Sequence, residues 1–197
     1  MAQQQKAPRP ESLDGFEFQA WPKTARLFRD IVVTEKLDGT NAAIHISEDG
    51  RVAAQSRNRL ITPEHDNYGF ARWVHENAAE IADVFGPGLH FGEFWGRGIG
   101  RKYGLEKRRF SLFNTAAWRD LGGDIGGVWV DSVPVLYEGV FDETEIRQQL
   151  YYLQVGGSKA APGFMNPEGI CVYHTQTRQV MKVTLDNADA GKWEAAA

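Results

Sequence analysis

The feature that most constrains the fold is a series of short stretches in which apolar and polar residues alternate. In residues 40–47, Ala42, Ile44 and Ile46 alternate with polar side chains, which is the period of a half-buried strand. Similar strands are expected over residues 31–37, 51–56, 89–95, 109–115, 128–130, 135–140, 168–174 and 179–185. Short strands with few intervening helices predict an α+β fold of mostly antiparallel sheets with flanking helices.

The connections between these stretches carry turn and helix signals. Asp38-Gly39 separates the first two strands, so we expect those two strands to pair as a hairpin. One helix is expected over residues 70–85, because its apolar residues share a face and a Gly-Pro-Gly sequence follows. A second helix is expected over residues 142–153, with a capping box at its start.

The length of the chain, 197 residues, suits one domain with one substantial core. We expect residues 1–12 to be a disordered leader and residues 13–197 to form a single domain. No apolar run approaches membrane-spanning length, and the first ten residues are polar rather than signal-like. A soluble cytoplasmic protein that does not bind a membrane is therefore expected.

Charge and cysteine usage argue against several kinds of site. The formal net charge of −4 disfavours a protein coated with basic surface for nucleic acid. The single cysteine, Cys171, excludes an internal disulfide framework and a cysteine-based zinc site, and we interpret it as a small buried strand residue. The five histidines lack the spacing of zinc ligands.

One stretch of the chain is nevertheless strongly basic. Between residues 97 and 109, six basic residues are opposed by one acidic residue, Glu106. The stretch is either a solvated loop or a path for a polyanion such as a nucleic-acid backbone. Its basic residues are Arg97, Arg101, Lys102, Lys107, Arg108 and Arg109.

The hexapeptide Lys36-Leu-Asp-Gly-Thr-Asn41 follows an apolar strand. A lysine beside a carboxylate and a glycine can be a covalent nucleophile, a phosphate anchor or a surface charge. The hexapeptide alone does not decide between these roles, but four further segments of the chain add to it.

Taken in order, these five segments resemble the covalent nucleotidyltransferases, which are the ATP-dependent polynucleotide ligases and their mRNA-capping relatives. Within that superfamily the chain is most similar to the adenylation domain of the RNA ligase 2 family. The segments that carry the resemblance are Glu35-Lys-Leu-Asp-Gly-Thr-Asn41, Phe91-Gly-Glu-Phe-Trp-Gly-Arg-Gly-Ile99, Phe110-Ser-Leu-Phe-Asn114, Pro167-Glu-Gly-Ile-Cys-Val172 and Val180-Met-Lys-Val183.

The resemblance implies a nucleotidyltransferase fold with an ATP pocket between its sheets. It implies an ATP-dependent RNA ligase that joins 5′-phosphate and 3′-hydroxyl ends through a lysyl-AMP intermediate and uses Mg²⁺ or Mn²⁺. Such an enzyme would act on RNA ends, in particular on a nicked duplex, with the basic stretch of residues 97–109 tracking the phosphates.

The resemblance also implies a set of site residues. Those expected to be catalytic are Lys36 as the nucleophile, Asp38 and Lys182. Those expected to bind the nucleotide are Glu35, Asn41, Arg57, Glu93, Phe113 and Glu168. Those expected to hold the metal are Glu168, Glu93 and Asp38.

Two of these assignments also have support from the residues themselves. Glu93 lies among aromatic residues, where a carboxylate is costly to bury unless it has polar partners. Phe113 is expected to stack on adenine, whereas Phe110 lies three positions earlier in a strand and should face the other side.

The chain departs from the family pattern in its fifth segment. Lys182 is present, but Thr184 stands where the family usually has a second basic residue. We also expect no separate C-terminal OB or helical domain, so a partner protein could supply that function.

Two alternative functions therefore stay open. One is a DNA nick ligase or a capping-type nucleotidyltransferase that uses GTP. The other is a degenerate ligase domain that binds nucleotide or RNA ends without sealing them.

Overall fold

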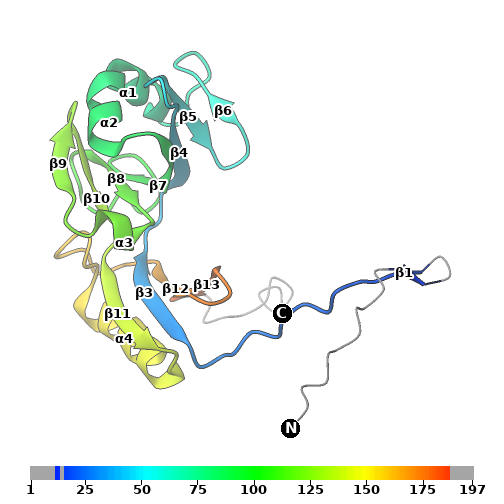
Figure 1. Ribbon diagram of the computed structural model, residues 1–197. Coiled ribbons are helices and arrows are strands. Elements are labelled where there is room, and N and C mark those ends of the chain that lie inside the picture. Colours follow the sequence, from blue (N-terminus) through cyan, green and yellow to red (C-terminus); the bar gives the residue numbers. More distant parts are fainter. Residues whose placement is uncertain (1–11, 14–15, 187–197) are drawn as a thin grey trace, which may run out of the picture.

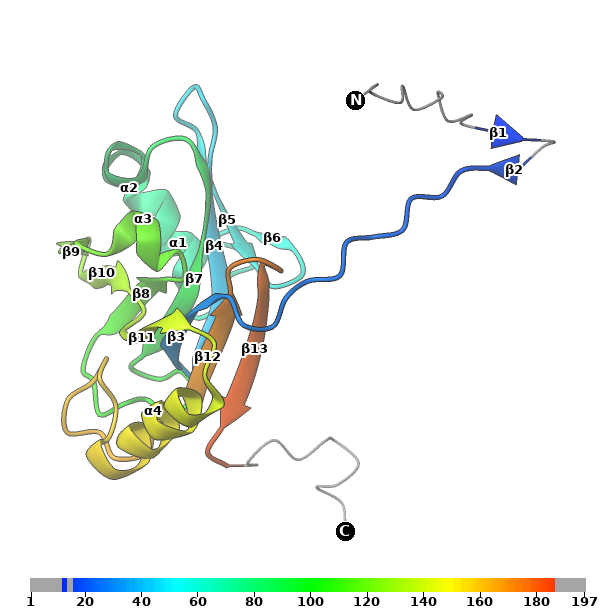
Figure 2. The same ribbon diagram turned by 60° about the horizontal axis from the view of Figure 1, so that its bottom comes forward.

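The computed structural model of the protein describes residues 12–13 and 16–186. The leader expected over residues 1–12 therefore lies outside the described residues, except for Ser12. A small two-stranded sheet pairs β1 (Ser12–Leu13) with β2 (Phe16–Glu17). Figure 2 shows the chain after β2 running as an extended arm toward the rest of the molecule.

Most described strands belong to one large sheet (Figure 1). It has seven strands in the order β6-β5-β4-β7-β8-β10-β9. Their bounds are β4 Thr40–Ile46, β5 Val52–Ser56, β6 Leu60–Ile61, β7 Gly88–Gly96, β8 Arg108–Leu112, β9 Gly122–Ile125 and β10 Val128–Ser132.

A second sheet of four strands has the order β11-β3-β12-β13. Its strands are β3 Asp30–Lys36, β11 Val135–Val140, β12 Gly169–His174 and β13 Gln179–Thr184. Across both sheets every pairing is antiparallel except that of β10 with β8. The predicted α+β fold with mostly antiparallel sheets is confirmed.

The helices cover the outer faces of the sheets (Figure 1). The helix expected over residues 70–85 is divided into α1 (Phe70–Glu76) and α2 (Ala78–Phe85). Asn77 separates them, because its side-chain amide donates to the carbonyl of Trp73 at 2.8 Å and the backbone leaves helical geometry there. The short helix α3 (Thr115–Trp118) begins where a strand was expected to continue.

The second predicted helix is α4 (Glu143–Gly156), which ends three residues later than expected. Its start is capped by Asp142, whose carboxylate accepts a hydrogen bond from the Thr144 amide at 2.7 Å. Leu153 is its fully buried residue and packs with β3 and β12 residues such as Val33 and Ile170. The helix therefore covers one face of the four-stranded sheet.

A larger apolar core lies between the seven-stranded sheet and the helices α1 and α2. Its centre is aromatic: Phe70 lies 5.1 Å from Phe94 and 5.3 Å from Phe110, measured between ring centroids. Because Phe94 and Phe110 face this core, neighbouring residues such as Glu93 and Ser111 point to the opposite face of the sheet.

The predicted hairpin of residues 31–37 and 40–47 is wrong. β3 pairs with β11 and β12, whereas β4 pairs with β5 and β7, so the two strands belong to different sheets. Gly39 lies at the crossing, where a Cβ atom would be 2.5 Å from the carbonyl oxygen of Phe94 and 2.7 Å from Cβ of Trp95. The Asp38-Gly39 pair thus carries the chain from one sheet to the other through a tight gap.

None of the described helices combines the length and the apolar character that a membrane crossing requires.

Candidate functional site

The crossing between the two sheets forms one wall of a cavity of about 310 Å³. Residues 36–41 line it as the chain passes from β3 into β4, together with Arg57 and Glu93. Arg57 follows β5 and Glu93 lies on β7, so three separate segments of the chain converge on one space. In the sequence, Glu93 and Arg57 lie outside the segment of residues 35–41, and the structure brings them to it.

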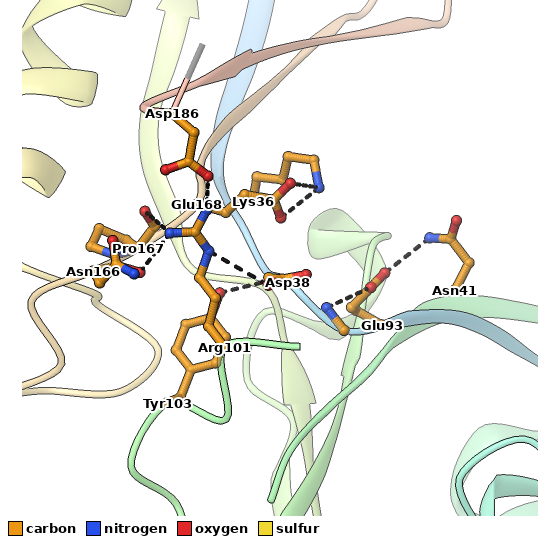
Figure 3. A network of polar contacts seen from close by, with 11 residues as sticks. Lys36, Asp38, Asn41, Glu93, Arg101, Tyr103, Asn166, Pro167, Glu168 and Asp186 are labelled. Carbon is orange, nitrogen blue, oxygen red and sulfur yellow. Dashed lines mark hydrogen bonds and ion pairs between the residues drawn. The ribbon is translucent and has the colours of Figure 1, made fainter. Parts of the chain in front are cut away.

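Lys36 is held in an ion pair with Glu168 (Figure 3). Its Nζ atom lies 2.7 Å from each carboxylate oxygen of Glu168, and both side chains are about four-fifths buried, with exposed fractions of 22% and 18%. Gly169 follows Glu168 directly and lies opposite Lys36 in the pairing of β12 with β3. Strand register therefore fixes the segment of residues 167–172 (the fourth motif) against the segment of residues 35–41 (the first motif).

Glu93 is buried beside the same cavity and is bound by the crossing segment. Its Oε1 accepts a hydrogen bond from the Gly39 amide at 3.1 Å, and its Oε2 accepts one from Asn41 Nδ2 at 2.9 Å (Figure 3). Burial raises the pKa of Glu93 to about 7, although the positive charge of Lys36 acts in the opposite direction. Near neutral pH this carboxyl is thus poised between its protonated and ionised forms.

A second hollow of about 160 Å³ shares Asn41 and Arg57 with the first. Phe91 and Phe113 contribute exposed aromatic surface to it, with exposed fractions of 50% and 44%. The two residues are neighbours, since the Phe113 amide donates to the Phe91 carbonyl at 2.9 Å. Phe110 is fully buried in the core, so it faces away as the strand period predicted.

Asp38 is surrounded by the loop between β7 and β8. Its amide donates to the hydroxyl oxygen of Tyr103 at 2.8 Å, and its Oδ2 lies 3.5 Å from Nε of Arg101 (Figure 3). Burial is the main reason that the pKa of Tyr103 is raised, so the hydroxyl stays neutral. Asp38 is therefore engaged by protein groups on two sides.

The fifth motif lies on β13, one strand away from the fourth. Lys182 is opposite Cys171, which is opposite Thr34 on β3, and residues paired in this way share a face of the sheet. In the next row, Thr184 is opposite Gly169 and hence aligned with Lys36. Both positions of the motif therefore lie on the face of the sheet that carries Lys36.

Cys171 lies on this face. It is partly buried, whereas the sequence predicted a buried strand residue. Burial raises the pKa of its thiol, and the charges that act on it are those of Lys36, Glu168, Glu93 and Lys182. These four residues therefore cluster around one strand position, which agrees with the convergence of the motifs.

The structure differs from the sequence expectation for Glu35. Its side chain faces the opposite side of β3 from Lys36, is 1% exposed, and accepts hydrogen bonds from the amides of Lys159 and Ala160 at 2.7 and 3.0 Å. Burial raises its pKa. Strand alternation is the cause: if Lys36 faces the cavity, its neighbour cannot. Glu35 anchors a loop, and it is not among the residues that line the cavity.

The basic stretch does not form one continuous track either. Arg101 and Arg109 are engaged inside the protein, since Arg109 donates to the Ala160 carbonyl at 3.0 Å and stacks on Trp95. Arg108 lies over the ring of Phe94. The remaining basic residues of the stretch are exposed, and these are Arg97, Lys102 and Lys107.

The carboxylates beside the cavity are candidate ligands of a metal ion. Within residues 12–13 and 16–186, no three His, Cys, Asp or Glu side chains gather closely enough to form a metal cage. Mg²⁺, however, is commonly bound by one or two carboxylates together with substrate phosphates and waters. Glu93 and Glu168 act on each other electrostatically and fit that donor set, whereas Asp38 is engaged by Arg101.

Sequence reasoning missed two features of the site. Phe91 lies two residues before Glu93, so the strand period alone could have placed its ring on the same face. The approach of Arg101 to Asp38 has no such signal, because it depends on how the loop between β7 and β8 folds back.

Comparisons with known proteins show which family the chain belongs to. A model of the RNA ligase family matches residues 29–184. A search of curated proteins gave no significant match.

Solved structures of an RNA ligase from Naegleria gruberi share the fold. A variant with ATP and manganese is 19% identical, with a TM-score of 0.57, and the match covers 80% of this chain and 50% of that chain. A form with pyrophosphate is 20% identical, with a TM-score of 0.54 and the same coverage. The chain thus spans about half the length of the structures it matches. Because the family model matches most of the chain, including every motif described above, the protein belongs to the RNA ligase family.

Proposed function

We propose that this protein is an ATP-dependent RNA ligase of the RNA ligase 2 type, which joins 5′-phosphate and 3′-hydroxyl ends through a lysyl-AMP intermediate on Lys36. The observation that carries the proposal is the convergence of Lys36, Glu93 and Arg57 on one cavity, with Glu168 bound to the lysine amine. This arrangement supplies a nucleophile, a proton acceptor and a cation for a phosphate group in a single space.

The proposed reaction has three group transfers. The Lys36 amine attacks the α-phosphorus of ATP, so that an N–P bond forms and pyrophosphate leaves. The 5′-phosphate of the RNA then displaces lysine and takes the AMP. Finally the 3′-hydroxyl attacks that phosphate, which forms the phosphodiester and releases AMP.

Glu168 has a specific part in the first transfer. The amine must lose a proton before it attacks. Among the described residues, the side chain that accepts a hydrogen bond from Lys36 Nζ is Glu168, through Oε2 at 2.7 Å. The ion pair also holds the amine beside the cavity before a nucleotide binds. Binding of a nucleotide beside the pair is expected to separate the two charges.

The other side chains of the site have roles that follow from their positions. Phe113 and the hollow around it would accept the adenine base, because aromatic surface there is exposed. Arg57 lines both hollows and would contact a phosphate between them. Lys182 would add a second cation on the face of Lys36.

A divalent ion, Mg²⁺ or Mn²⁺, would be held by Glu93 and Glu168 together with phosphate oxygens and waters. When bound, it would neutralise negative charge on the phosphates of ATP. Asp38 would act on the ion only indirectly, since its carboxylate faces Arg101.

The proposal is tested by incubating the protein with ATP labelled at the α-phosphate. Label should appear on Lys36 after digestion and should be absent from Lys36→Ala. Lys159→Ala is the matched control, because Lys159 is an exposed lysine whose backbone, rather than its side chain, contacts Glu35. An unlabelled wild-type protein, or equal labelling of Lys36→Ala, would overturn the proposal.

The substrate is tested separately with nicked duplexes. Sealing of nicked RNA is expected to exceed sealing of nicked DNA, and covalent labelling with ATP is expected to exceed covalent labelling with GTP. The opposite order would identify a DNA nick ligase or a capping-type enzyme.

Thr184 favours a second candidate function. With an uncharged residue in the row of Lys36, the domain could bind nucleotide or RNA ends without sealing them. Binding of ATP without covalent label would favour this candidate over the first.

A further inference from the structure

We propose that Arg101 is a positioning residue that ties the motif of Lys36 to the strands that carry Glu168 and Lys182. The inference rests on the proposed function, because it concerns the same covalent step. It replaces the expectation that Arg101 tracks RNA phosphates. The structure supports it through the contacts of the guanidinium group, the shape of its loop and the burial of its side chain.

The guanidinium group of Arg101 contacts three separate segments (Figure 3). Nε lies 3.5 Å from Oδ2 of Asp38, within the nucleophile motif. Nη1 donates to the carbonyls of Asn166 and Pro167 at 3.2 and 3.4 Å, immediately before Glu168. Nη2 pairs with Asp186, just after β13. One side chain thus connects the first, fourth and fifth motifs.

The loop that carries Arg101 is folded tightly around Asp38. Gly100 approaches so closely that a Cβ atom there would lie 2.5 Å from the Asp38 carbonyl oxygen. Lys102 and Tyr103 both have positive φ angles, 63° and 49°, which are unfavourable for residues with a side chain. Consecutive strained residues persist where the surrounding structure holds them, and they concentrate at functional sites.

Burial separates a positioning role from an RNA-binding role. The Arg101 side chain is 13% exposed. Its Nη1 and Nη2 atoms donate to oxygens of the protein, and its Nε atom lies 3.5 Å from Oδ2 of Asp38 without a hydrogen-bond partner among the described residues. A phosphate-tracking arginine needs an exposed guanidinium group. Arg97, in contrast, is exposed and lies four residues earlier in the same loop.

The contacts explain how Arg101 would affect the reaction. Asp38 lies two residues after Lys36, and the carbonyls bound by Arg101 directly precede the glutamate that contacts the Lys36 amine. Loss of the guanidinium group would free both segments. A displacement of about 1 Å at a reacting group can slow a reaction about 100-fold.

The experiment compares Arg101→Lys and Arg101→Ala with the matched exposed variants Arg97→Lys and Arg97→Ala. Single-turnover lysyl-AMP formation is measured over a range of ATP concentrations, and RNA affinity is measured at two salt concentrations. Thermal melting identifies any variant that fails to fold. Arg101→Lys keeps the charge but loses the planar fork, so it remains informative if Arg101→Ala unfolds.

We expect Arg101→Lys to lower the maximal rate of lysyl-AMP formation about tenfold and Arg101→Ala about 100-fold, without a matching loss of RNA affinity. The Arg97 variants should label at the wild-type rate. The inference is overturned if wild type is labelled and both Arg101 variants form lysyl-AMP as fast as wild type does. It is also overturned if the defect of these variants is a salt-dependent loss of RNA affinity. An unlabelled wild type would instead refute the proposed function.

A double-mutant cycle checks that the effect passes through Asp38. Arg101→Lys and Asp38→Asn are measured singly and together by the same single-turnover assay. Residues that act as one unit give non-additive effects. The combined variant should therefore be hardly slower than the worse single variant, and fully multiplied effects would contradict the connection.

Discussion

Both carboxylate oxygens of Glu168 lie 2.7 Å from the amine of Lys36. The contact joins residues 132 positions apart in the chain, and it is produced by the register of β12 against β3. Gly169 fits this register because a Cβ atom there would lie 2.1 Å from the Val183 carbonyl oxygen. The ion pair is therefore a product of the sheet itself rather than of a flexible loop.

The first prediction concerns this ion pair. Replacing Glu168 with glutamine keeps the size of the side chain but removes its negative charge and most of its ability to accept the lysine proton. We expect Glu168→Gln to slow lysyl-AMP formation by about 100-fold, as is typical for loss of a general base. Rapid-quench measurement with labelled ATP gives the rate.

The control for this prediction is Glu138→Gln. Glu138 is an exposed carboxylate of the same sheet, paired with Arg119 on the surface. This variant should label at the wild-type rate. Equal rates for Glu168→Gln and wild type would show that Glu168 is not the proton acceptor.

The second prediction concerns the pH dependence of stability. Burial raises the pKa of Glu93 from 4.5 to about 7 in the folded protein, so the folded state binds a proton more tightly than the unfolded state. The stability that this provides is fully present below pH 4.5 and is lost as the pH rises through 7. The loss is roughly 3 kcal/mol as an upper value.

Denaturant unfolding at pH 5 and pH 8 measures this effect. Glu35 and Asp131 also have pKa values raised by burial, so the wild-type slope contains their contributions. Glu93→Gln removes only the contribution of Glu93, and its free energy of unfolding should fall less between the two pH values. An identical slope in wild type and Glu93→Gln would contradict the prediction.

The third prediction concerns the two aromatic rings of the second hollow. Stacking of a base on an aromatic side chain is worth about 1–3 kcal/mol by alanine substitution. We expect Phe113→Ala to weaken ATP binding about tenfold or more, and Phe91→Ala to weaken it less. Trp129→Ala is the control, because Trp129 is similarly exposed but lies on β10, outside both hollows. Calorimetric titration of ATP into each variant provides the affinities.

Much of the fold could be predicted from the alternation of apolar and polar residues alone. Each strand of residues 31–184 that was expected from period-two patterning is present, and most of these strands contribute buried residues to the two larger apolar cores. Pairing partners could not be predicted in the same way. The Asp38-Gly39 pair is typical of a hairpin, but β11, β12, β5 and β7 supply all the pairing partners of β3 and β4.

The fourth prediction follows from that correction. In a surface hairpin turn, the cost of alanine at position 39 would come from a positive φ angle, but Gly39 is not among the glycines with positive φ. In the crossing, the new Cβ would collide with the Phe94 carbonyl at 2.5 Å, so we expect Gly39→Ala to destabilise the protein by about 1–3 kcal/mol. The control is Gly123→Ala, because a Cβ atom at Gly123 would meet no neighbour within 4 Å. Gly50→Ala is unsuitable because Gly50 has a positive φ angle, which strains alanine. Equal melting temperatures of Gly39→Ala and Gly123→Ala would contradict the prediction.

The site shows the same division between local and long-range information. Lys36, Glu93 and Glu168 could be chosen from their motifs, because the family resemblance assigns a role to a charged residue in each of them. The direction of Glu35 follows from the direction of Lys36, but only once the inner face of β3 is known. The position of Arg101 could not be predicted, because a charged residue in a glycine-rich loop has no period that fixes where it points.

The last prediction concerns Thr184, which is aligned with Lys36 across Gly169. Two strand spacings separate the aligned backbones by about 10 Å, and glycine contributes no side chain between them. A lysine at position 184 could therefore extend its ammonium group toward phosphates bound near Lys36. We expect Thr184→Lys to accelerate lysyl-AMP formation about tenfold, because a cation beside a transferring phosphoryl group stabilises its developing charge. Thr184→Met, which is long but uncharged, is the matched control. If both variants react at the same rate, the missing charge in this motif does not limit the covalent step.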